Sequence, residues 1–274
     1  MQRLWFVSNV HSGTATHEKC EALEAVLAEH GLELAGRTRF PDDDLPGKME
    51  LAAARADTVM LFAGDGTINA ALCKLADWDG AVLILPGGTM NLLAKTLHAA
   101  SDPPAIVTAA HRRARQIALP YAEAGRHRAF VGLIVGPATA WAHAREAARK
   151  RRPADLLRAA RDAWRRTFGR GTRLEGAPRL RGRYQALVVT PHDNGLTVAG
   201  IDARDWRAVA ELGWSWLTGD WLATRAVDTA HVPSLRVPAD RDVACLFDGE
   251  VETLPHGTAI TAGRTAPVFL STRA

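Results

Sequence analysis

Cysteine is scarce in this chain of 274 residues. Its three cysteines, Cys20, Cys73 and Cys245, lie far apart and form none of the closely spaced pairs that bind metals. Because disulfides are rare in reducing compartments, this low and scattered usage is typical of an intracellular protein.

Long apolar runs are missing as well. No stretch approaches the roughly 20 apolar residues that a membrane-spanning helix needs, and the apolar run at residues 4–7 is too short for a signal peptide. We therefore expect any membrane contact to be peripheral. The sequence also lacks internal repeats and low-complexity linkers. Its composition, 47% hydrophobic and 23% charged, suits one large or two moderate globular domains.

Positive charge is unevenly distributed along the chain. Residues 145–183, the basic segment, hold 14 Lys or Arg against 4 Asp or Glu, a net charge of +10 that leaves −6 for the remainder. Within it, residues 155–168 form a helical pattern with one apolar face, as expected for a helix lying on an anionic membrane. The alternative is a helix packed on its own domain with solvated arginines. Because no zinc-finger, RNA-binding or helix-turn-helix signal accompanies the charge, we expect no nucleic-acid partner.

One stretch carries most of the chemical information. A buried-strand pattern at residues 58–62 stops at Ala63-Gly64-Asp65-Gly66-Thr67, and a helical pattern follows over residues 68–76. Glycines on both sides of a carboxylate let backbone N–H groups approach an anion, and the helix start adds free N–H donors. The stretch therefore predicts a phosphate-binding turn, in which Asp65 is useful if Mg²⁺ accompanies the phosphate. A purely structural strand–turn–helix junction is the alternative.

Strands and helices alternate up to about residue 115, which predicts an α/β domain with an open parallel sheet. Ligands then lie beyond the carboxyl ends of strands, where residues 9–13, 64–69 and 87–91 form loops. The predicted strands are residues 4–7, 32–38, 58–62 and 81–85. The predicted helices are residues 16–30, 48–56 and 68–76, and a further helix begins with residues 91–97.

After residue 115 the pattern changes to short β-type runs separated by turns, which predicts an antiparallel β-sandwich. Residues 268–271 are apolar enough to return to the first sheet as an added strand. We therefore expect an α/β domain at residues 1–115, joined by 266–274, and a β-sandwich domain at 116–265.

Three motifs in this order resemble the diacylglycerol kinase catalytic-domain family, which includes bacterial lipid kinases, sphingosine kinases and ceramide kinases. They are Gly64-Asp65-Gly66-Thr67-Ile68-Asn69, the stretch at residues 85–94, and Phe247-Asp248-Gly249-Glu250. The resemblance implies an ATP- and Mg²⁺-dependent kinase that phosphorylates a hydroxyl of a diacylglycerol, ceramide or sphingoid lipid. It implies that the domain at residues 1–115 binds the nucleotide and that the β-sandwich domain at 116–265 binds the lipid. With the cysteine usage and the basic segment, we expect a cytoplasmic protein bound peripherally at the inner membrane face.

The same resemblance assigns roles to individual residues. Glu250 corresponds to the family's proposed proton acceptor, with Asp248 beside it, and Asp65 is the third catalytic candidate and the candidate Mg²⁺ contact. Asp248-Gly249 is also a strong hairpin-turn signal, which gives a structural alternative. The residues implied in nucleotide binding are Asn9, Ser12, Gly13, Thr38, Gly64, Gly66, Thr67, Asn69, Gly88, Thr89 and Asn91.

The chain departs from the family pattern at several positions. Ala63 stands where a glycine is usual, Ala70 where a glutamate is usual, and Val10 where proline follows the asparagine. An Asp-Asp-Gly turn tied to a structural Mg²⁺ in bacterial members is matched here by Asp193-Asn194-Gly195 only. Two other functions stay open: an NAD kinase, which shares Gly-Asp-Gly, and a non-catalytic nucleotide- or lipid-binding regulator.

Overall fold

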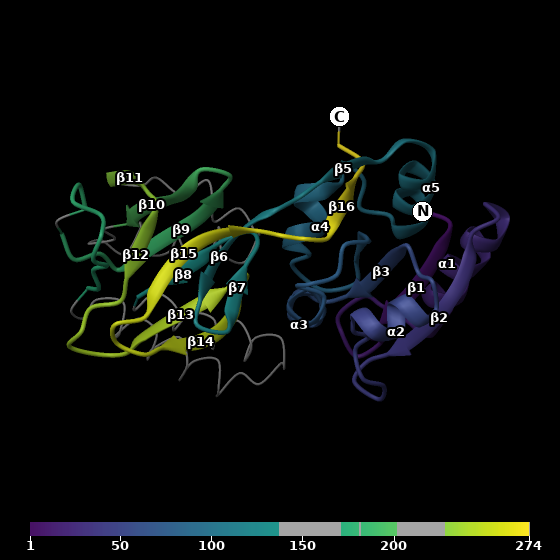
Figure 1. Cartoon of the computed structure of the whole chain (residues 1–274), viewed down its shortest axis with the longest axis horizontal. Coiled ribbons are helices and arrows are strands. Elements are labelled where there is room, and N and C mark those ends of the chain that lie inside the picture. The colour runs from purple at the N-terminus through teal and green to yellow at the C-terminus, as the bar shows by residue number, and fades with distance from the viewer. Residues whose placement is uncertain (137–170, 181, 202–227, 274) are drawn as a thin grey trace, which may run out of the picture. The chain divides into compact units, whose positions relative to one another are not determined.

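The computed structural model describes residues 1–136, 171–180, 182–201 and 228–273, and the chain divides into two compact units (Figure 1). Unit 1 comprises Met1–Leu119 and Arg264–Ala274, and unit 2 comprises Pro120–Gly263. The chain thus passes from one unit to the other four residues later than the sequence pattern suggested. The reason is that the β-type run at 116–120 is split between two strands, one in each unit.

Unit 1 is built on a six-stranded sheet with the strand order β2-β1-β3-β4-β16-β5. All neighbouring pairs are parallel except β16–β5, so the predicted parallel sheet carries one antiparallel strand at its edge. Its strands are β1 (Arg3–Ser8), β2 (Glu33–Arg39), β3 (Thr58–Ala63), β4 (Ala81–Pro86), β16 (Val268–Ser271) and β5 (Arg115–Ile117).

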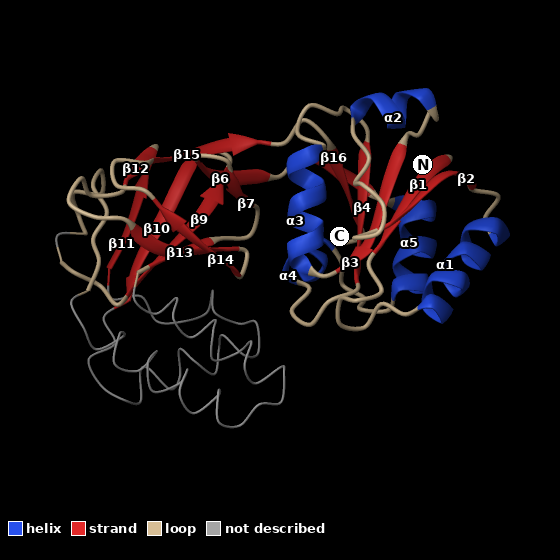
Figure 2. Ribbon diagram, turned by 90° about the horizontal axis from the view of Figure 1, so that it is seen from below, coloured by secondary structure: helices blue, strands red, loops and turns tan. Residues whose placement is uncertain are grey.

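Helices cover both faces of this sheet, which is why its central strands are apolar throughout (Figure 2). Met60 and Phe62 of β3 pack in one cluster with Leu23 and Leu27 of α1 and with α5. The helix α3 lies on the other face. The helices are α1 (His17–Glu29), α2 (Lys48–Ala53), α3 (Asp65–Lys74), α4 (Leu92–Leu97) and α5 (Pro103–Arg113).

Two of these helices differ from the sequence prediction. Helix α3 begins at Asp65, three residues before the predicted start, so the Asp-Gly-Thr of the motif forms its first turn. Glycine has a low helix propensity, which masked this start. Helix α5 was not predicted at all, although its signals are present: the Asp102 side chain accepts from Ala105 N (3.1 Å), and Pro103 occupies the first position.

The C-terminal strand β16 returns to the sheet of unit 1 as the sequence suggested, pairing parallel with β4 and antiparallel with β5. His98, which follows α4, fastens this return. Its two ring nitrogens lie 3.0 Å from Thr272 Oγ1 and 2.9 Å from the carbonyl oxygen of Ile84 in β4. The imidazole is 2% exposed, and this burial lowers the pKa of His98 to about 4.

The buried imidazole of His98 predicts a pH-dependent stability. Between pH 4 and the unfolded value near 6.5, the unfolded chain binds a proton that the folded chain does not, so stability is full above about pH 6.5 and falls toward pH 4. The linked loss is about 3 kcal/mol. Urea unfolding at pH 7 and pH 4.5 measures it, and His98→Gln should flatten the difference. An equal pH dependence in both proteins would contradict this assignment.

Unit 2 is an antiparallel two-sheet domain, as predicted. One sheet has the strand order β11-β10-β9-β8-β13-β14, and the other has β12-β15-β6-β7. Side chains of both sheets, among them Val189, Cys245, Leu235 and Ile260, share one buried core. The strands are β6 (Pro120–Ala124), β7 (His127–Ala129), β8 (Leu133–Val135), β9 (Ala186–His192), β10 (Gly195–Ile201), β11 (Asp228–Val232), β12 (Ser234–Arg236), β13 (Val243–Phe247), β14 (Glu250–Leu254) and β15 (Ala259–Arg264).

The expected membrane helix at 155–168, and with it most of the basic segment 145–183, lies outside the described residues. Within the parts of the chain that the structure describes, no helix has both the length and the apolar character needed to cross a membrane.

Candidate functional site

Three loops meet at the carboxyl ends of β1, β3 and β4, as expected for a parallel sheet. Glycines make the approach possible. A Cβ added to Gly13 would lie 2.8 Å from the carbonyl carbon of Gly88, and one added to Gly88 would lie 2.7 Å from the Cα of Gly64. Real Cβ atoms do not come so close to backbone, so these glycines set the spacing of the loops. The sequence-predicted residues of the three loops therefore form one cluster within unit 1.

The loop after β1 is hydrogen-bonded to the start of α3. Asn9 is 8% exposed, and its side-chain amide donates to Thr67 Oγ1 (2.9 Å) while its Oδ1 accepts from the N–H of His11 (2.9 Å). The Ser12 hydroxyl donates to the carbonyl of Asn9 (2.6 Å) and accepts from the N–H of Gly64 (3.0 Å). Asn9 and Ser12 thus hold the loop against α3 through Thr67 and Gly64.

Asp65 joins α3 to the loop after β4. Its carboxylate accepts the N–H of Asn91 at Oδ2 (3.0 Å) and the N–H of Leu92 at Oδ1 (2.8 Å). These are the first N–H groups of α4, whose own N-cap residue Asn91 has left-handed backbone (φ 51°) and makes no side-chain cap. The Asp65 carboxylate therefore takes the place of that cap. These contacts indicate that Asp65 positions the start of α4 relative to α3. Its contact with a metal ion remains a prediction.

Asn91 in turn shapes the glycine loop that precedes it. Its Oδ1 accepts from the N–H of Gly88 (2.7 Å), and its side-chain amide donates to the Gly88 carbonyl (3.0 Å). The N–H groups of Gly64 and Gly88 are consequently used by side chains of this site. The first turn of α3 also presents the N–H groups of Gly66 and Thr67, because the first N–H groups of a helix have no intrahelical acceptor.

The remaining predicted nucleotide contacts differ in exposure. Thr89 is exposed beside the buried Gly88, so its hydroxyl can reach a ligand. Asn69 lies one turn into α3 and accepts from the Cys73 thiol (3.6 Å). Thr38 is only 2% exposed, and its hydroxyl accepts the indole N–H of Trp5 (2.9 Å). A structural role explains Thr38 in this arrangement, and its predicted nucleotide contact remains untested.

Replacing Gly13 with alanine should lower the affinity for Mg-ATP, whereas replacing Gly31 with alanine should not. Both glycines have left-handed backbone, φ +60° and +66°, so alanine costs roughly 1–2 kcal/mol at either position. A Cβ at Gly13 meets backbone atoms of the loop after β4, whereas at Gly31 none of the described residues lies within 4 Å. Titration with Mg-ATP should show lost affinity for Gly13→Ala only. Equal affinity in the two variants would show that the loop spacing is unimportant.

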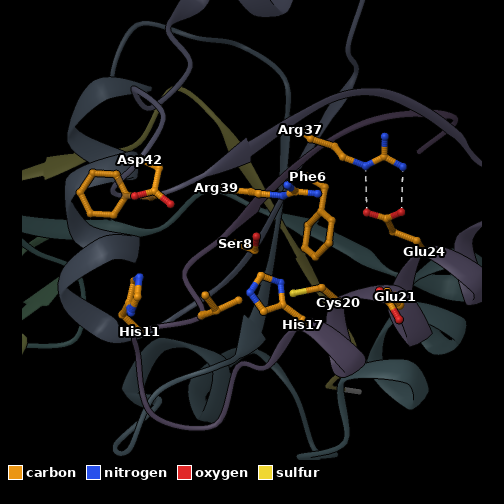
Figure 3. Close-up of a pocket in the computed structure, with 12 residues that line it drawn as sticks. Phe6, Ser8, His11, His17, Cys20, Glu21, Glu24, Arg37, Arg39 and Asp42 are labelled. Carbon is orange, nitrogen blue, oxygen red and sulfur yellow. Dashed lines mark hydrogen bonds and ion pairs between the residues drawn. The ribbon is translucent and has the colours of Figure 1, made fainter.

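A cavity of about 470 Å³ opens at the carboxyl ends of β1 and β2, beside the loop that carries Asn9 (Figure 3). Its walls carry both charges, including an ion pair in which Arg37 donates to Glu24 (2.7 and 2.9 Å). Burial raises the pKa of the Cys20 thiol, and a hydrogen bond with Ser8 partly offsets this. The lining residues are Phe6, Ser8, Val10, His11, His17, Cys20, Glu21, Glu24, Arg37, Arg39, Phe40 and Asp42. Its volume is in the range of small-molecule sites.

The two C-terminal candidates lie in unit 2, at one end of the β13–β14 hairpin. Phe247 pairs with Glu250, so Asp248 and Gly249 form a two-residue turn, with φ values of 48° and 97°. The predicted hairpin turn is therefore present. Asp248 is 7% exposed, whereas Glu250 is exposed as the first residue of β14. Because the turn separates Asp248 from Glu250, the two carboxylates do not lie on one face of a single extended strand.

The described residues contain few side chains that could bind a magnesium ion. No group of three or more His, Cys, Asp or Glu side chains there could hold a metal. Asp193 and Asn194 form the turn between β9 and β10, since His192 pairs with Gly195.

Comparison with known proteins identifies the fold. Residues 3–121 match the family model of the diacylglycerol kinase catalytic domain, which confirms the resemblance seen in the first two motifs. The solved structure of a diacylglycerol kinase from Bacillus anthracis str. Sterne has a TM-score of 0.68 at 16% identity, with 98% of this chain and 97% of that chain covered. Two further solved structures from the same organism match with the same TM-score and coverage at 14% and 15% identity. A search of curated proteins gives no match.

Proposed function

We propose, on the premise that residues 3–121 match the diacylglycerol kinase catalytic domain, that this chain is an ATP-dependent lipid kinase. It transfers the terminal phosphoryl group of ATP to a hydroxyl of a diacylglycerol-, ceramide- or sphingoid-type lipid. The observation that carries the proposal is the meeting of three glycine-bearing loops at the first turn of α3, where Gly13 and Gly88 lie too close to neighbouring backbone for any side chain.

Phosphoryl transfer depends mainly on positioning and on neutralising charge, and unit 1 offers both. The N–H groups of Asp65, Gly66 and Thr67 lie at the positive end of the α3 dipole, which favours an anion. Gly66 adds no side chain that would keep phosphate oxygens away. The hydroxyl of Thr89 adds an exposed donor from the third loop. In this proposal, Asn9, Ser12 and Asn91 hold the loops, and the backbone binds the phosphates.

The cavity beside the Asn9 loop supports nucleotide binding in a second way. Its volume of about 470 Å³ accommodates a nucleoside-sized group, and Ser8 and Val10 of its lining flank Asn9 in the chain. Mg²⁺, when bound with ATP, would neutralise phosphate charge. Asp65 is the carboxylate of the cluster that could contact it directly or through water.

The acceptor hydroxyl needs a base within hydrogen-bond reach, and Glu250 is the candidate. Its side chain is exposed at the start of β14, as a group that meets a second substrate must be. General base catalysis supplies roughly 10²–10⁴-fold of the rate, and positioning and electrostatics supply the rest. Peripheral attachment to an anionic membrane through residues 145–183 belongs to the same proposal.

Two of the departures from the family pattern, Ala63 and Ala70, lie outside the contacts of the proposed site. Ala63 is the buried last residue of β3, where Gly87 packs against its backbone, and Ala70 is exposed on α3. Neither side chain enters the described contacts among Asn9, Asp65 and Asn91. The regulator hypothesis, which these two substitutions motivated, therefore gains no support from the geometry.

A radiolabelled-ATP screen tests the proposed acceptor. The purified chain is incubated with Mg-ATP and with diacylglycerol, ceramide, sphingosine or NAD, and labelled products are separated. Label in one of the lipids supports the lipid kinase and names its substrate. Label in NAD alone would replace it with an NAD kinase, and ATP binding without any labelled acceptor would favour the regulator.

A further inference from the structure

The Asp248 carboxylate is occupied by the backbone of another segment of unit 2. Its Oδ2 accepts the N–H of Phe130 (2.8 Å), and its Oδ1 accepts the N–H groups of Val131 and Gly132 (both 2.9 Å). In return, the N–H of Asp248 donates to the Gly132 carbonyl (3.1 Å). Three consecutive amides that converge on an anion form the kind of concave nest that binds carboxylates and phosphates.

This contact connects two elements that are distant in sequence. Residues 130–132 link β7 to β8, which are strands of the two different sheets, and Asp248 lies 116–118 residues further along. The contact also fixes a backbone that non-glycine residues rarely adopt, since Asp248 has φ 48°. Because Glu250 pairs with Phe247 across the turn, anything that moves the turn moves the first residue of β14.

We infer that Asp248 is a positioning residue, which clamps the turn to residues 130–132 and thereby holds Glu250 in place. The inference rests on the proposed function, in which Glu250 meets the acceptor hydroxyl. It separates two neighbouring carboxylates that share one motif. Asp248 is buried and bound to three amides, so it acts through the backbone, whereas Glu250 is exposed and can touch a substrate.

The substitution Asp248→Asn tests the clamp with a residue-specific readout. The asparagine oxygen can still accept from Val131 and Gly132, but its NH₂ group then faces the N–H of Phe130. Hydrogen exchange of the full-length variant should therefore be faster at the Phe130 amide, by about tenfold or more, than at the other two. Asp248→Ala should release all three amides.

Kinetics provide the second readout. Asp248→Asn should lower kcat about 10–100-fold through misplacement of Glu250, while the pH dependence of kcat/KM stays that of the parent chain. Asp242→Asn is the matched control, because Asp242 accepts the N–H of His256 (2.9 Å) at the opposite end of the same hairpin. It should change neither readout.

Three results would overturn the inference. The first is an Asp248→Asn variant with the parent's exchange at Phe130, and the second is one with the parent's kcat. The third is a variant that removes an ionisation from the pH profile, because that would make Asp248 the base itself. If the parent chain phosphorylates no acceptor, the proposed function fails, and the exchange measurement still decides whether the clamp exists.

Discussion

Asp65→Asn is expected to abolish most phosphoryl transfer and to weaken Mg-ATP binding. The two oxygens of Asp65 accept the N–H groups of Asn91 and Leu92 at the start of α4. An asparagine at this position would direct its NH₂ group at one of these two N–H groups. The loss of one charge-assisted hydrogen bond, with an unpaired donor left behind, costs about 2 kcal/mol of stability. The loop after β4 would then shift relative to α3, and a misplacement near 1 Å lowers the rate about 10²-fold.

Asp57→Asn is the matched control for this variant. Asp57 precedes β3 whereas Asp65 follows it, and its Oδ2 accepts the backbone N–H groups of Gln2 (2.8 Å) and Arg3 (3.2 Å). The Asp57→Asn variant should lose stability without losing nucleotide affinity, because Asp57 lies at the amino end of β3, away from the loops at the carboxyl ends of the strands. Calorimetric titration with Mg-ATP and thermal unfolding separate the two effects. Parent-like affinity in Asp65→Asn would remove Asp65 from the site.

Glu250→Gln is expected to lower kcat roughly 10²–10⁴-fold while leaving nucleotide affinity and stability near the parent values. Glutamine keeps the shape of the side chain but cannot take a proton from an alcohol. Since Glu250 is exposed at the start of β14, its replacement leaves the buried core of unit 2 intact. Initial rates at saturating ATP and saturating lipid measure the effect on kcat directly.

Glu252→Gln controls for a general loss of negative charge on β14. Glu252 lies two residues further along the same strand, and its Oε1 is 3.5 Å from Nδ1 of His127. Glu252 has no role in the proposed reaction. The kcat of the Glu252→Gln variant should therefore stay within about twofold of the parent value, as is usual for surface positions. An unchanged kcat in Glu250→Gln, or an equal loss in both variants, would contradict the assignment of Glu250 as base.

The sequence pattern predicted that the three loops lie together, because strand ends and glycines are local signals. A parallel sheet brings the carboxyl ends of β1, β3 and β4 to one edge, so the three loops could be placed together without coordinates. The close backbone contacts of Gly13 with Gly88 and of Gly88 with Gly64, by contrast, became visible only in the structure. The return of residues 268–271 was predictable from their apolar character.

The backbone contacts of Asp65 and Asp248 could not be predicted from the sequence. Asp65 binds amides 26 and 27 residues away, and Asp248 binds amides more than 100 residues away. Such pairings depend on how the chain folds back, which residue spacing alone does not encode. The same limit applies to Thr38, whose hydroxyl meets Trp5 of the neighbouring strand. Proximity in a motif suggested shared chemistry for Asp248 and Glu250, whereas the fold gives them different surroundings.

The transfer of labelled phosphate from ATP to a total lipid extract, by the parent chain and by Glu250→Gln, tests the central claim most directly. The account predicts one labelled lipid class with the parent chain in the presence of Mg²⁺, and a loss of that label in the variant at unchanged ATP affinity. Binding of ATP by the parent chain with no labelled lipid would contradict it.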